Sequence, residues 1–185
     1  DNVLVGNGGD EIILDIVLAW GGPGRTLLDL PPTFAMYGID ARMTGTTIVE
    51  VPRLADFAVD EAALLGAIAE HDPDIVVIAN PNNPTGTMAP ETLLIEVLNA
   101  TDAIVLVDEA YFEFSRQTMR PHMSRHHNLA ILRTFSKAFS LAGLRAGYLL
   151  ASSDVTRELT KVRQPYSVNR FTQLAASLTF RERVV

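Results

Sequence analysis

The chain combines two kinds of hydrophobic pattern. Apolar residues recur at positions 12, 13, 16, 17 and 20, a spacing that places them on one face of a helix. Continuous apolar runs such as IVVIA at 75–79 are instead typical of strands buried on both faces. The pattern predicts strands over 26–30, 46–51, 74–79, 103–107, 129–133 and 144–150, after a short apolar run at 2–8, and helices over 9–20, 34–43, 60–70, 90–100 and 154–163 and from about 169 onward. A polar, histidine-rich loop is expected over 115–127.

Buried strands that alternate with helices predict the α/β class, with a mostly parallel central sheet covered by helices on both faces. The length of 185 residues allows one good-sized core and leaves little room for a second compact domain. The chain starts at Asp1 and stops at Val185 inside a predicted helix. We therefore expect it to be the middle of a longer protein, or the part that survived processing.

Composition narrows the possible functions. The formal net charge of −7 argues against a nucleic-acid partner, which requires a basic face. No apolar run has the length of a membrane span, and no signal peptide is recognisable, so no membrane partner is expected. The absence of cysteines is compatible with a reducing compartment, and we expect a cytoplasmic protein. The histidines match no metal-ligand spacing and are expected at the surface: His71, His122, His126 and His127.

Dense polar segments follow three of the predicted strands. Strand 74–79 runs into NPNNPTG at 80–86, strand 103–107 into DEAY at 108–111, and strand 129–133 into TFSK at 134–137. A glycine turn at 8–9 opens the first helix. Ligands of open α/β sheets bind outside the carboxyl ends of the strands. These segments are therefore expected to meet at one edge of the sheet.

Each segment also has an ordinary structural interpretation. The segment 80–86 could be only a tight turn, and Asp108 could be a helix cap. Lys137 could extend into water, and Arg145 could pair with any nearby acid. The glycine-rich start is not a dinucleotide fingerprint, because Glu11 occupies its third glycine position. The joint occurrence of these segments at equivalent strand ends favours a functional site.

The lysine is the most informative single residue. Lys137 stands among small and hydroxylated neighbours, namely Thr134, Ser136, Ala138 and Ser140. If these surroundings bury the amine, its charge is disfavoured and it becomes a usable nucleophile.

A lysine, a carboxylate and an anion site at a helix start together describe pyridoxal phosphate binding. Asp108 would face the pyridine nitrogen, and Asn83 and Tyr111 could bond to the phenolic oxygen. Backbone amides at the helix start, with Ser136 and Arg145, would bind the phosphate. The acids at positions 10 and 11 carry the sign of a phosphate, so their side chains are expected to turn away.

Six motifs run in one order along nearly the whole chain: GNGGDE at 6–11, PPTFAMYG at 31–38, NPNNPTG at 80–86, DEAYFEF at 108–114, RTFSKAFSLAGLRAGY at 133–148 and QPYSVN at 164–169. In these motifs the chain resembles the fold-type I pyridoxal-phosphate aminotransferases of class I/II. Within that group it is most similar to histidinol-phosphate aminotransferase and its aromatic aminotransferase relatives. The match is very specific for the family and less specific for the substrate.

The resemblance implies roles for ten residues. Lys137 would bind the cofactor covalently, Asp108 would pair with the pyridine nitrogen, and Phe34 would stack on the ring without offering a hydroxyl. Tyr111 and Asn83 would contact the phenolic oxygen. The phosphate would lie at Gly9, Asp10, Ser136 and Arg145, with assistance from Thr134. Lys137, Asp108 and Tyr111 would be the catalytic members of this set.

The resemblance further implies transamination from histidinol phosphate or an aromatic amino acid to a 2-keto acid such as 2-oxoglutarate, in a homodimer. Family members are about twice as long, with an N-terminal segment and a C-terminal small domain. Residues 1–185 would then be an incomplete cofactor-binding large domain, poor at turnover alone. A decarboxylase of a phosphorylated amino acid, a non-catalytic cofactor-sensing domain and a fragment with an empty site remain as alternatives.

Overall fold

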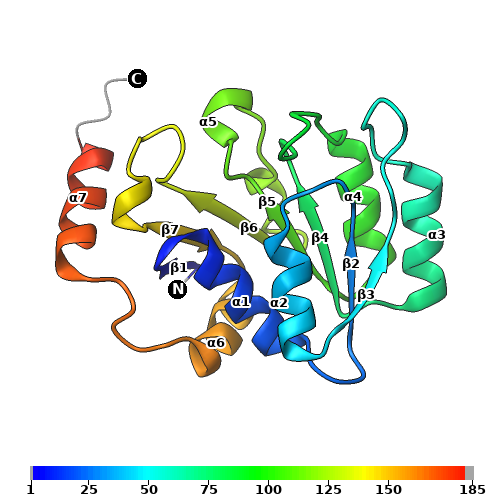
Figure 1. Cartoon of the computed structure of the whole chain (residues 1–185), viewed down its shortest axis with the longest axis horizontal. Helices are drawn as coiled ribbons and strands as arrows, with labels where there is room; N and C mark the ends of the chain where they lie inside the picture. Colours follow the sequence, from blue (N-terminus) through cyan, green and yellow to red (C-terminus); the bar gives the residue numbers. More distant parts are fainter. Residues whose placement is uncertain (1, 182–185) are drawn as a thin grey trace.

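Seven strands form one sheet in the computed structural model, which describes residues 2–181 (Figure 1). β7 runs antiparallel to both of its neighbours, β1 and β6, and the other pairings of the described strands are parallel. The strand order is β1 (Val3–Gly6), β7 (Gly147–Leu150), β6 (Leu129–Thr134), β5 (Ile104–Asp108), β4 (Ile75–Ala79), β2 (Thr26–Asp29) and β3 (Thr47–Glu50). The prediction of an α/β fold with a mostly parallel sheet is confirmed.

Helices cover both faces of the sheet and enclose two hydrophobic cores. The first core joins one face to α1 (Gly8–Trp20), α2 (Met36–Thr44) and α6 (Ser153–Val162). The second joins the other face to α3 (Glu61–His71) and α4 (Glu91–Ala100). Strand β4 shows why its sequence is apolar throughout: Ile75 and Val77 belong to the first core, and Val76 and Ile78 belong to the second.

Several helices begin at the residue that the sequence indicates. The Asp60 carboxylate accepts a hydrogen bond of 3.0 Å from the amide of Ala63 and caps α3. The Asn169 side chain accepts one of 2.9 Å from the amide of Thr172, at the start of α7 (Arg170–Arg181). The predicted continuation of this last helix to Val185 lies outside the described residues.

Two segments differ from the sequence-based expectation. The predicted strand 144–150 begins only at Gly147, because a 3-10 turn, η2 (Ala142–Leu144), precedes Arg145, whose φ is 51°. The predicted loop 115–127 contains the 3-10 helix η1 (Arg120–His122) and follows a short helix, α5 (Phe112–Ser115). Such single turns are too short to produce a periodic apolar pattern.

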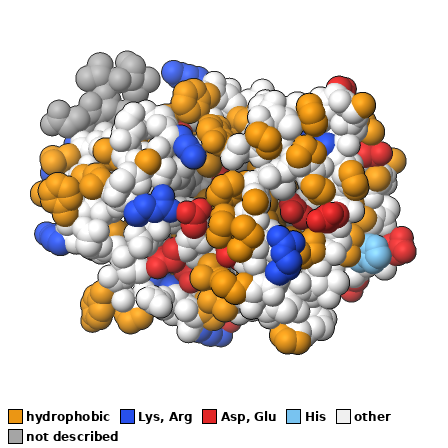
Figure 2. All heavy atoms as spheres, in the orientation of Figure 1, with side chains coloured by type: hydrophobic (Ala, Val, Ile, Leu, Met, Phe, Trp, Pro, Cys, Tyr) orange, Lys and Arg blue, Asp and Glu red, His pale blue; other side chains and the backbone are white. Residues whose placement is uncertain are grey.

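The surface in Figure 2 has the orientation of Figure 1 and shows hydrophobic side chains gathered near its centre, with acidic and basic side chains beside them. Within residues 2–181, no helix combines the length and the apolar character that a membrane crossing requires.

Candidate active site

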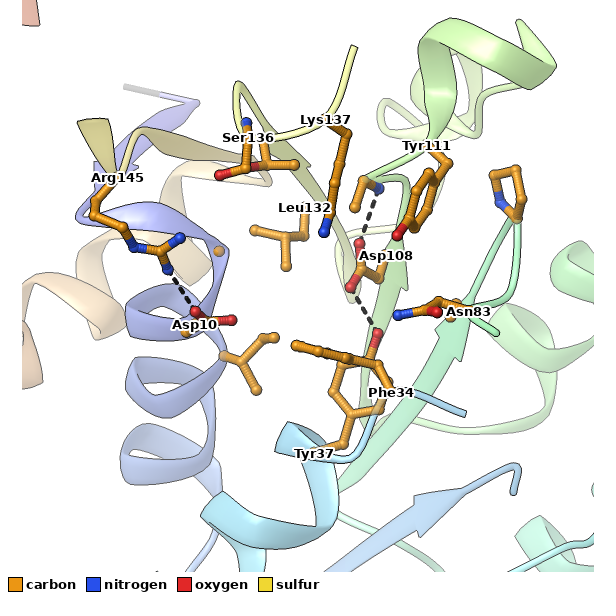
Figure 3. Close-up of a pocket in the computed structure, with 16 residues that line it drawn as sticks. Asp10, Phe34, Tyr37, Asn83, Asp108, Tyr111, Leu132, Ser136, Lys137 and Arg145 are labelled. Carbon is orange, nitrogen blue, oxygen red and sulfur yellow. Dashed lines mark hydrogen bonds and ion pairs between the residues drawn. The ribbon is translucent and has the colours of Figure 1, made fainter. Parts of the chain in front are cut away.

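The carboxyl ends of β4, β5 and β6 and the start of α1 open into one cavity (Figure 3). Sheet register brings the strand ends level, since Asp108 pairs with Ala79 on one side and with Leu132 on the other. All ten residues singled out in the sequence line this cavity: Gly9, Asp10, Phe34, Asn83, Asp108, Tyr111, Thr134, Ser136, Lys137 and Arg145. The sequence-based expectation that these segments converge thus agrees with the structure.

Asp108 forms the floor of the cavity together with a residue that the sequence did not single out, Tyr37. The Tyr37 hydroxyl donates to Asp108 Oδ2 over 2.6 Å, and the backbone amide of Ala110 donates to Asp108 Oδ1 over 2.9 Å. Tyr37 is 1% exposed and Asp108 is 7% exposed, so both bonds are shielded from water. Each carboxylate oxygen can accept a second hydrogen bond from the side of the cavity.

Two opposing effects set the pKa of the Asp108 carboxyl. Burial raises the pKa of Asp108, and the hydrogen bonds from Tyr37 and from the amide of Ala110 act in the opposite direction. The pKa of the Tyr37 phenol lies well above its usual value, because the group is buried beside the Asp108 carboxylate. Tyr37 therefore stays a hydrogen-bond donor over the whole physiological range of pH.

One wall of the cavity carries Asn83 and Tyr111, and Phe34 lies below them (Figure 3). The Phe34 ring meets the Tyr37 ring edge to face, with centroids 5.7 Å apart and planes at 81°. The Tyr111 ring has the Lys137 ammonium 5.5 Å from its centroid. The hydroxyl end of Tyr111 points into the cavity on the side of Asn83.

The segment NPNNPTG serves both as a turn and as a wall of the site. Asn80 accepts from the amide of Ala89 over 2.8 Å. The Asn82 amide group donates to the carbonyl of Pro32 over 3.0 Å and to Thr85 Oγ1 over 2.7 Å. These two asparagines hold the loop, whereas Asn83 is the asparagine that lines the cavity. The tight-turn interpretation and the binding interpretation therefore apply to different residues of one motif.

Lys137 is exposed, so the expectation of a buried amine is wrong for the described structure. The loop after β6 lies at the rim of the cavity, and only the side chain extends inward, with Nζ above Leu132 and Asp108 (Figure 3). Among the other charged groups, the Lys137 ammonium is close enough to Asp108 to lower the pKa of that carboxyl. The amine therefore reaches the cavity from its open side.

Two glycines let the start of α1 approach β7. Gly8 has a φ of 85°, and a Cβ on Gly8 would lie 2.5 Å from Arg145 Nη2. A Cβ on Gly147 would lie 2.7 Å from the carbonyl carbon of Gly8. The missing side chains therefore allow the Arg145 guanidinium to lie beside the first turn of α1, next to Gly9 in the cavity lining.

The two acids of that first turn behave differently. The Glu11 carboxylate turns back to accept from the amide of Asn7 over 2.6 Å and from the Ser167 hydroxyl over 2.8 Å, as expected. Asp10 does not turn away: its Oδ2 lies 2.5 Å from Arg145 Nη2, and the carboxylate lines the cavity. The Arg145 guanidinium lies beside the first turn and attracts this carboxylate, which explains the departure from the expectation.

Thr134 and Ser136 line the cavity through the loop that they share. Thr134 Oγ1 donates to the carbonyl of Ala146 over 3.2 Å and accepts from the amide of Ser136 over 3.1 Å. The Thr134 hydroxyl therefore fixes the loop between β6 and β7. Assistance from Thr134 at a phosphate stays a prediction.

Tyr37 is the residue of the floor that sequence reasoning missed. It lies three positions after Phe34 in the motif PPTFAMYG, and both rings approach the same cavity. The spacing of three residues around a helix start was an available signal. The bond to Asp108, 71 residues away in sequence, had no local signal.

Comparison with known proteins adds a family to this geometry. The family model described as "Aminotransferase class I and II" matches residues 1–182. A histidinol-phosphate aminotransferase of Carboxydothermus hydrogenoformans is 47% identical over 178 residues, which cover 96% of this chain and 51% of that protein.

Solved structures agree with the fold. The histidinol-phosphate aminotransferase of Sinorhizobium meliloti, solved with pyridoxal-5'-phosphate, matches with a TM-score of 0.90 at 26% identity, covering 98% of this chain and 50% of that one. The L-threonine-O-3-phosphate decarboxylase of Porphyromonas gingivalis matches with a TM-score of 0.83 at 27% identity, covering 97% and 53%. The chain spans about half the length of the curated relatives it matches.

Proposed function

The chain belongs to the aminotransferase class I and II family, and we propose that it carries the pyridoxal-phosphate site of a transaminase. One observation carries this proposal above all others: the Lys137 amine and the buried Asp108 carboxylate, from neighbouring strand ends, face the same cavity. A primary amine opposite a buried carboxylate is the pair that a pyridinium aldehyde requires. Similarity to histidinol-phosphate aminotransferases supports the choice of reaction.

The residues present fit this cofactor. Ser136, Arg145 and the amides at the start of α1 would hold its phosphate, and Asp108 would face its ring nitrogen. A Cβ on Gly8 would fill the space that the Arg145 guanidinium now uses, so the glycine preserves the cationic end of the cavity. Asp10 is the carboxylate beside the residues that would hold the phosphate, and it is already paired with Arg145.

When bound, pyridoxal phosphate supplies an electrophilic carbon for amines and a cationic ring that withdraws electrons. The Asp108 carboxylate would hold a proton on the ring nitrogen. Asn83 and Tyr111 would donate to the phenolic oxygen from the opposite wall. Lys137 would bind the cofactor through Nζ, and the same nitrogen would be the base that moves the proton of the donor's α-carbon.

We assign histidinol phosphate or an aromatic amino acid as the amino donor and a 2-keto acid such as 2-oxoglutarate as the acceptor. The similarity to histidinol-phosphate aminotransferases supports the first of these donors. We also propose a cytoplasmic homodimer as the working form. Full-length protein assayed with histidinol phosphate and with phenylalanine would separate the two donors. Equal and negligible rates with both would contradict the assignment.

The chain offers a sharp test of the cofactor site, because its sequence contains only two lysines, Lys137 and Lys161. Incubation with pyridoxal phosphate should give a visible absorbance band, and borohydride should fix the cofactor to Lys137. Lys161 is exposed on α6 and pairs with Glu158, so Lys161→Ala is the matched control. Peptide mapping by mass spectrometry separates these two amines from the amino terminus. An adduct retained in Lys137→Ala would contradict the proposal.

A phosphoamino-acid decarboxylase is the second candidate, favoured by the similarity to the structure from Porphyromonas gingivalis. Both reactions would use the same amine and the same carboxylate, so the cavity does not distinguish them. Carbon dioxide release from O-phosphothreonine by the full-length protein, without conversion of the cofactor to its amine form, would favour the decarboxylase. Conversion of the cofactor by an amino donor would favour the transaminase.

A further inference from the structure

A buried ion pair lies directly behind the floor of the cavity. Glu109 follows Asp108 and turns to the opposite side of the strand end, where it is 1% exposed. Its Oε2 accepts from Arg133 Nε over 3.0 Å and from Arg133 Nη2 over 2.8 Å, and its Oε1 accepts from the amide of Met119 over 2.7 Å. Neither residue lines the cavity, so the proposed reaction does not use them directly.

The pair joins three segments of the chain, and we refer to it with Thr118 as the brace. Thr118 Oγ1 donates to Glu109 Oε2 and accepts from Arg133 Nη2, each over 2.8 Å. The Arg133 guanidinium carbon lies 3.5 Å from the centroid of the Phe112 ring. The brace therefore ties the ends of β5 and β6 to both ends of the segment 111–119.

Tyr111 lies between residues that the brace fixes. Its neighbour Phe112 stacks on Arg133, and the amide of Phe112 donates to the carbonyl of Glu109 over 2.9 Å. The Tyr111 ring itself contacts the Lys137 ammonium, 5.5 Å from its centroid, and the Phe114 ring, whose centroid is 6.3 Å away, and both of these residues are exposed. The brace therefore acts on the Tyr111 hydroxyl through the backbone on either side of it, together with the first hydrogen bonds of α5, in which the Tyr111 carbonyl accepts from the amides of Phe114 and Ser115.

A purely structural role is a poor explanation for a charged brace. Removing two charges from water costs free energy that apolar residues of the same size would not cost. A buried pair is useful when it selects one geometry, and here two nitrogens of one rigid guanidinium donate to Oε2 of Glu109 while the amide of Met119 donates to Oε1. The ion pair lies at the junction between the end of β5, which bears Asp108, and the segment that bears Tyr111.

We infer that Glu109 and Arg133 are positioning residues, which hold the Tyr111 hydroxyl at the phenolic oxygen of the cofactor. The inference rests on the proposed function and extends it to residues outside the cavity. A hydroxyl that donates to the phenolic oxygen favours its charged form. Loosening the brace therefore weakens this donation and moves the pH midpoint of the visible band upward.

The test compares pH titrations of the visible band in wild type and variants. Tyr111→Phe sets the full effect of losing the hydroxyl, about 1 pH unit upward. Arg133→Met breaks the brace and should move the midpoint upward by at least about half of that. Thr118→Val leaves the ion pair in place and should give a smaller shift in the same direction. Arg157→Met removes the same charge from an exposed pair with Asp154 and should give none.

Hydrogen exchange without cofactor provides a second readout. Amides of residues 111–119 should exchange at least about tenfold faster in Arg133→Met and faster to a lesser degree in Thr118→Val, with no change in Arg157→Met. If Arg133→Met does not fold, Arg133→Lys replaces it, because a single ammonium keeps the charge but lacks the two fixed donor nitrogens of the guanidinium.

The outcomes separate the two proposals. A normal wild-type band with an unchanged midpoint in the Arg133 and Thr118 variants, whatever their exchange rates, leaves the brace a merely structural feature and overturns the inference alone. A wild-type chain that forms no band overturns the proposed function and the positioning role together. Parallel upward shifts in Tyr111→Phe and Arg133→Met support both.

Discussion

The floor of the cavity and its rim use the same kinds of side chain at opposite degrees of exposure. At the floor, Tyr37 donates to Asp108, and both residues are at least nine-tenths buried. At the rim, Arg145 pairs with Asp10 through side chains that are 42% and 46% exposed. Both contacts are short, 2.6 Å and 2.5 Å, so distance alone does not distinguish the two regions.

Exposure makes these contacts energetically different. A buried polar group that loses its partner costs about 1–3 kcal/mol, because water cannot replace the partner. An exposed ion pair contributes about 0.2–1 kcal/mol and is screened by salt. The floor is therefore fixed before any ligand arrives, whereas the rim can exchange an internal carboxylate for an external anion.

Asp108→Asn should have the largest effect, because it removes the buried charge and keeps the shape. We expect cofactor affinity to fall by about 100-fold, as for the loss of one partner of a desolvated charge pair. Titration of the visible band at fixed pH measures this affinity. Asp154→Asn, which removes the same charge from the surface of α6, is the control. A loss of less than about threefold in Asp108→Asn would show that the floor is not the main source of affinity.

Tyr37→Phe should weaken cofactor binding by about tenfold, because Asp108 loses its side-chain donor. The hydrogen bond from Tyr37 lowers the pKa of Asp108, so its removal raises that pKa further. A larger fraction of Asp108 is then protonated at low pH, and the defect should be greater at pH 6 than at pH 8. A defect of the same size at both values would mean that Tyr37 acts only through packing.

Asp10→Asn tests the rim and should have the opposite sign. Without the carboxylate, Arg145 is free for an external anion, and affinity for inorganic phosphate should rise about two- to fivefold at low salt. The gain should shrink as salt increases. Glu11→Gln is a close control, because Glu11 has the same charge in the same helical turn but is bonded to Asn7 and Ser167. A weaker affinity in Asp10→Asn would mean that Asp10 organises the rim for the anion.

The sequence predicts the site residues that directly follow an apolar strand in the chain. Each strand end of a parallel sheet carries its own polar residues, so Asp108, Asn83 and Lys137 could be located from the runs that precede them. The apolar runs predicted the sheet for the same reason, since a strand buried on both faces has no polar positions.

Contacts between distant segments account for what the sequence could not reveal. The bond from Tyr37 to Asp108 and the pairing of Arg145 with Asp10 each join residues more than 70 positions apart. The exposure of Lys137 depends on the path of a loop whose residues carry no periodic pattern. The apolar pattern predicts a strand at Arg145, whereas this residue has a left-handed backbone with a φ of 51° and lies between η2 and β7.

Asp40 is a buried carboxylate without donors like those that Tyr37 and the amide of Ala110 provide to Asp108. It is 2% exposed, and among the described residues nothing donates to its Oδ2. Burial, helped by the nearby charge of Asp10, raises its pKa from 3.8 to about 6.

An acid whose pKa is raised by folding stabilises the protein most when protonated, so the wild type should lose stability as pH rises from about 4 through 6. Asp40→Asn should flatten this part of the profile, with a gain at pH 8 of only about 0.5 kcal/mol, or 1–2 °C in Tm, because its amide also needs partners. Thermal unfolding from pH 4 to pH 8 measures the profile, with exposed Glu70→Gln as the control. If Asp10→Asn moves the fall in stability to lower pH, then the charge of Asp10 at the rim raises the pKa of the buried Asp40 carboxyl. If Asp40→Asn and the wild type have parallel stability profiles, Asp40 does not titrate in this range. The charges of the rim then have no measurable effect on the core beneath the cavity.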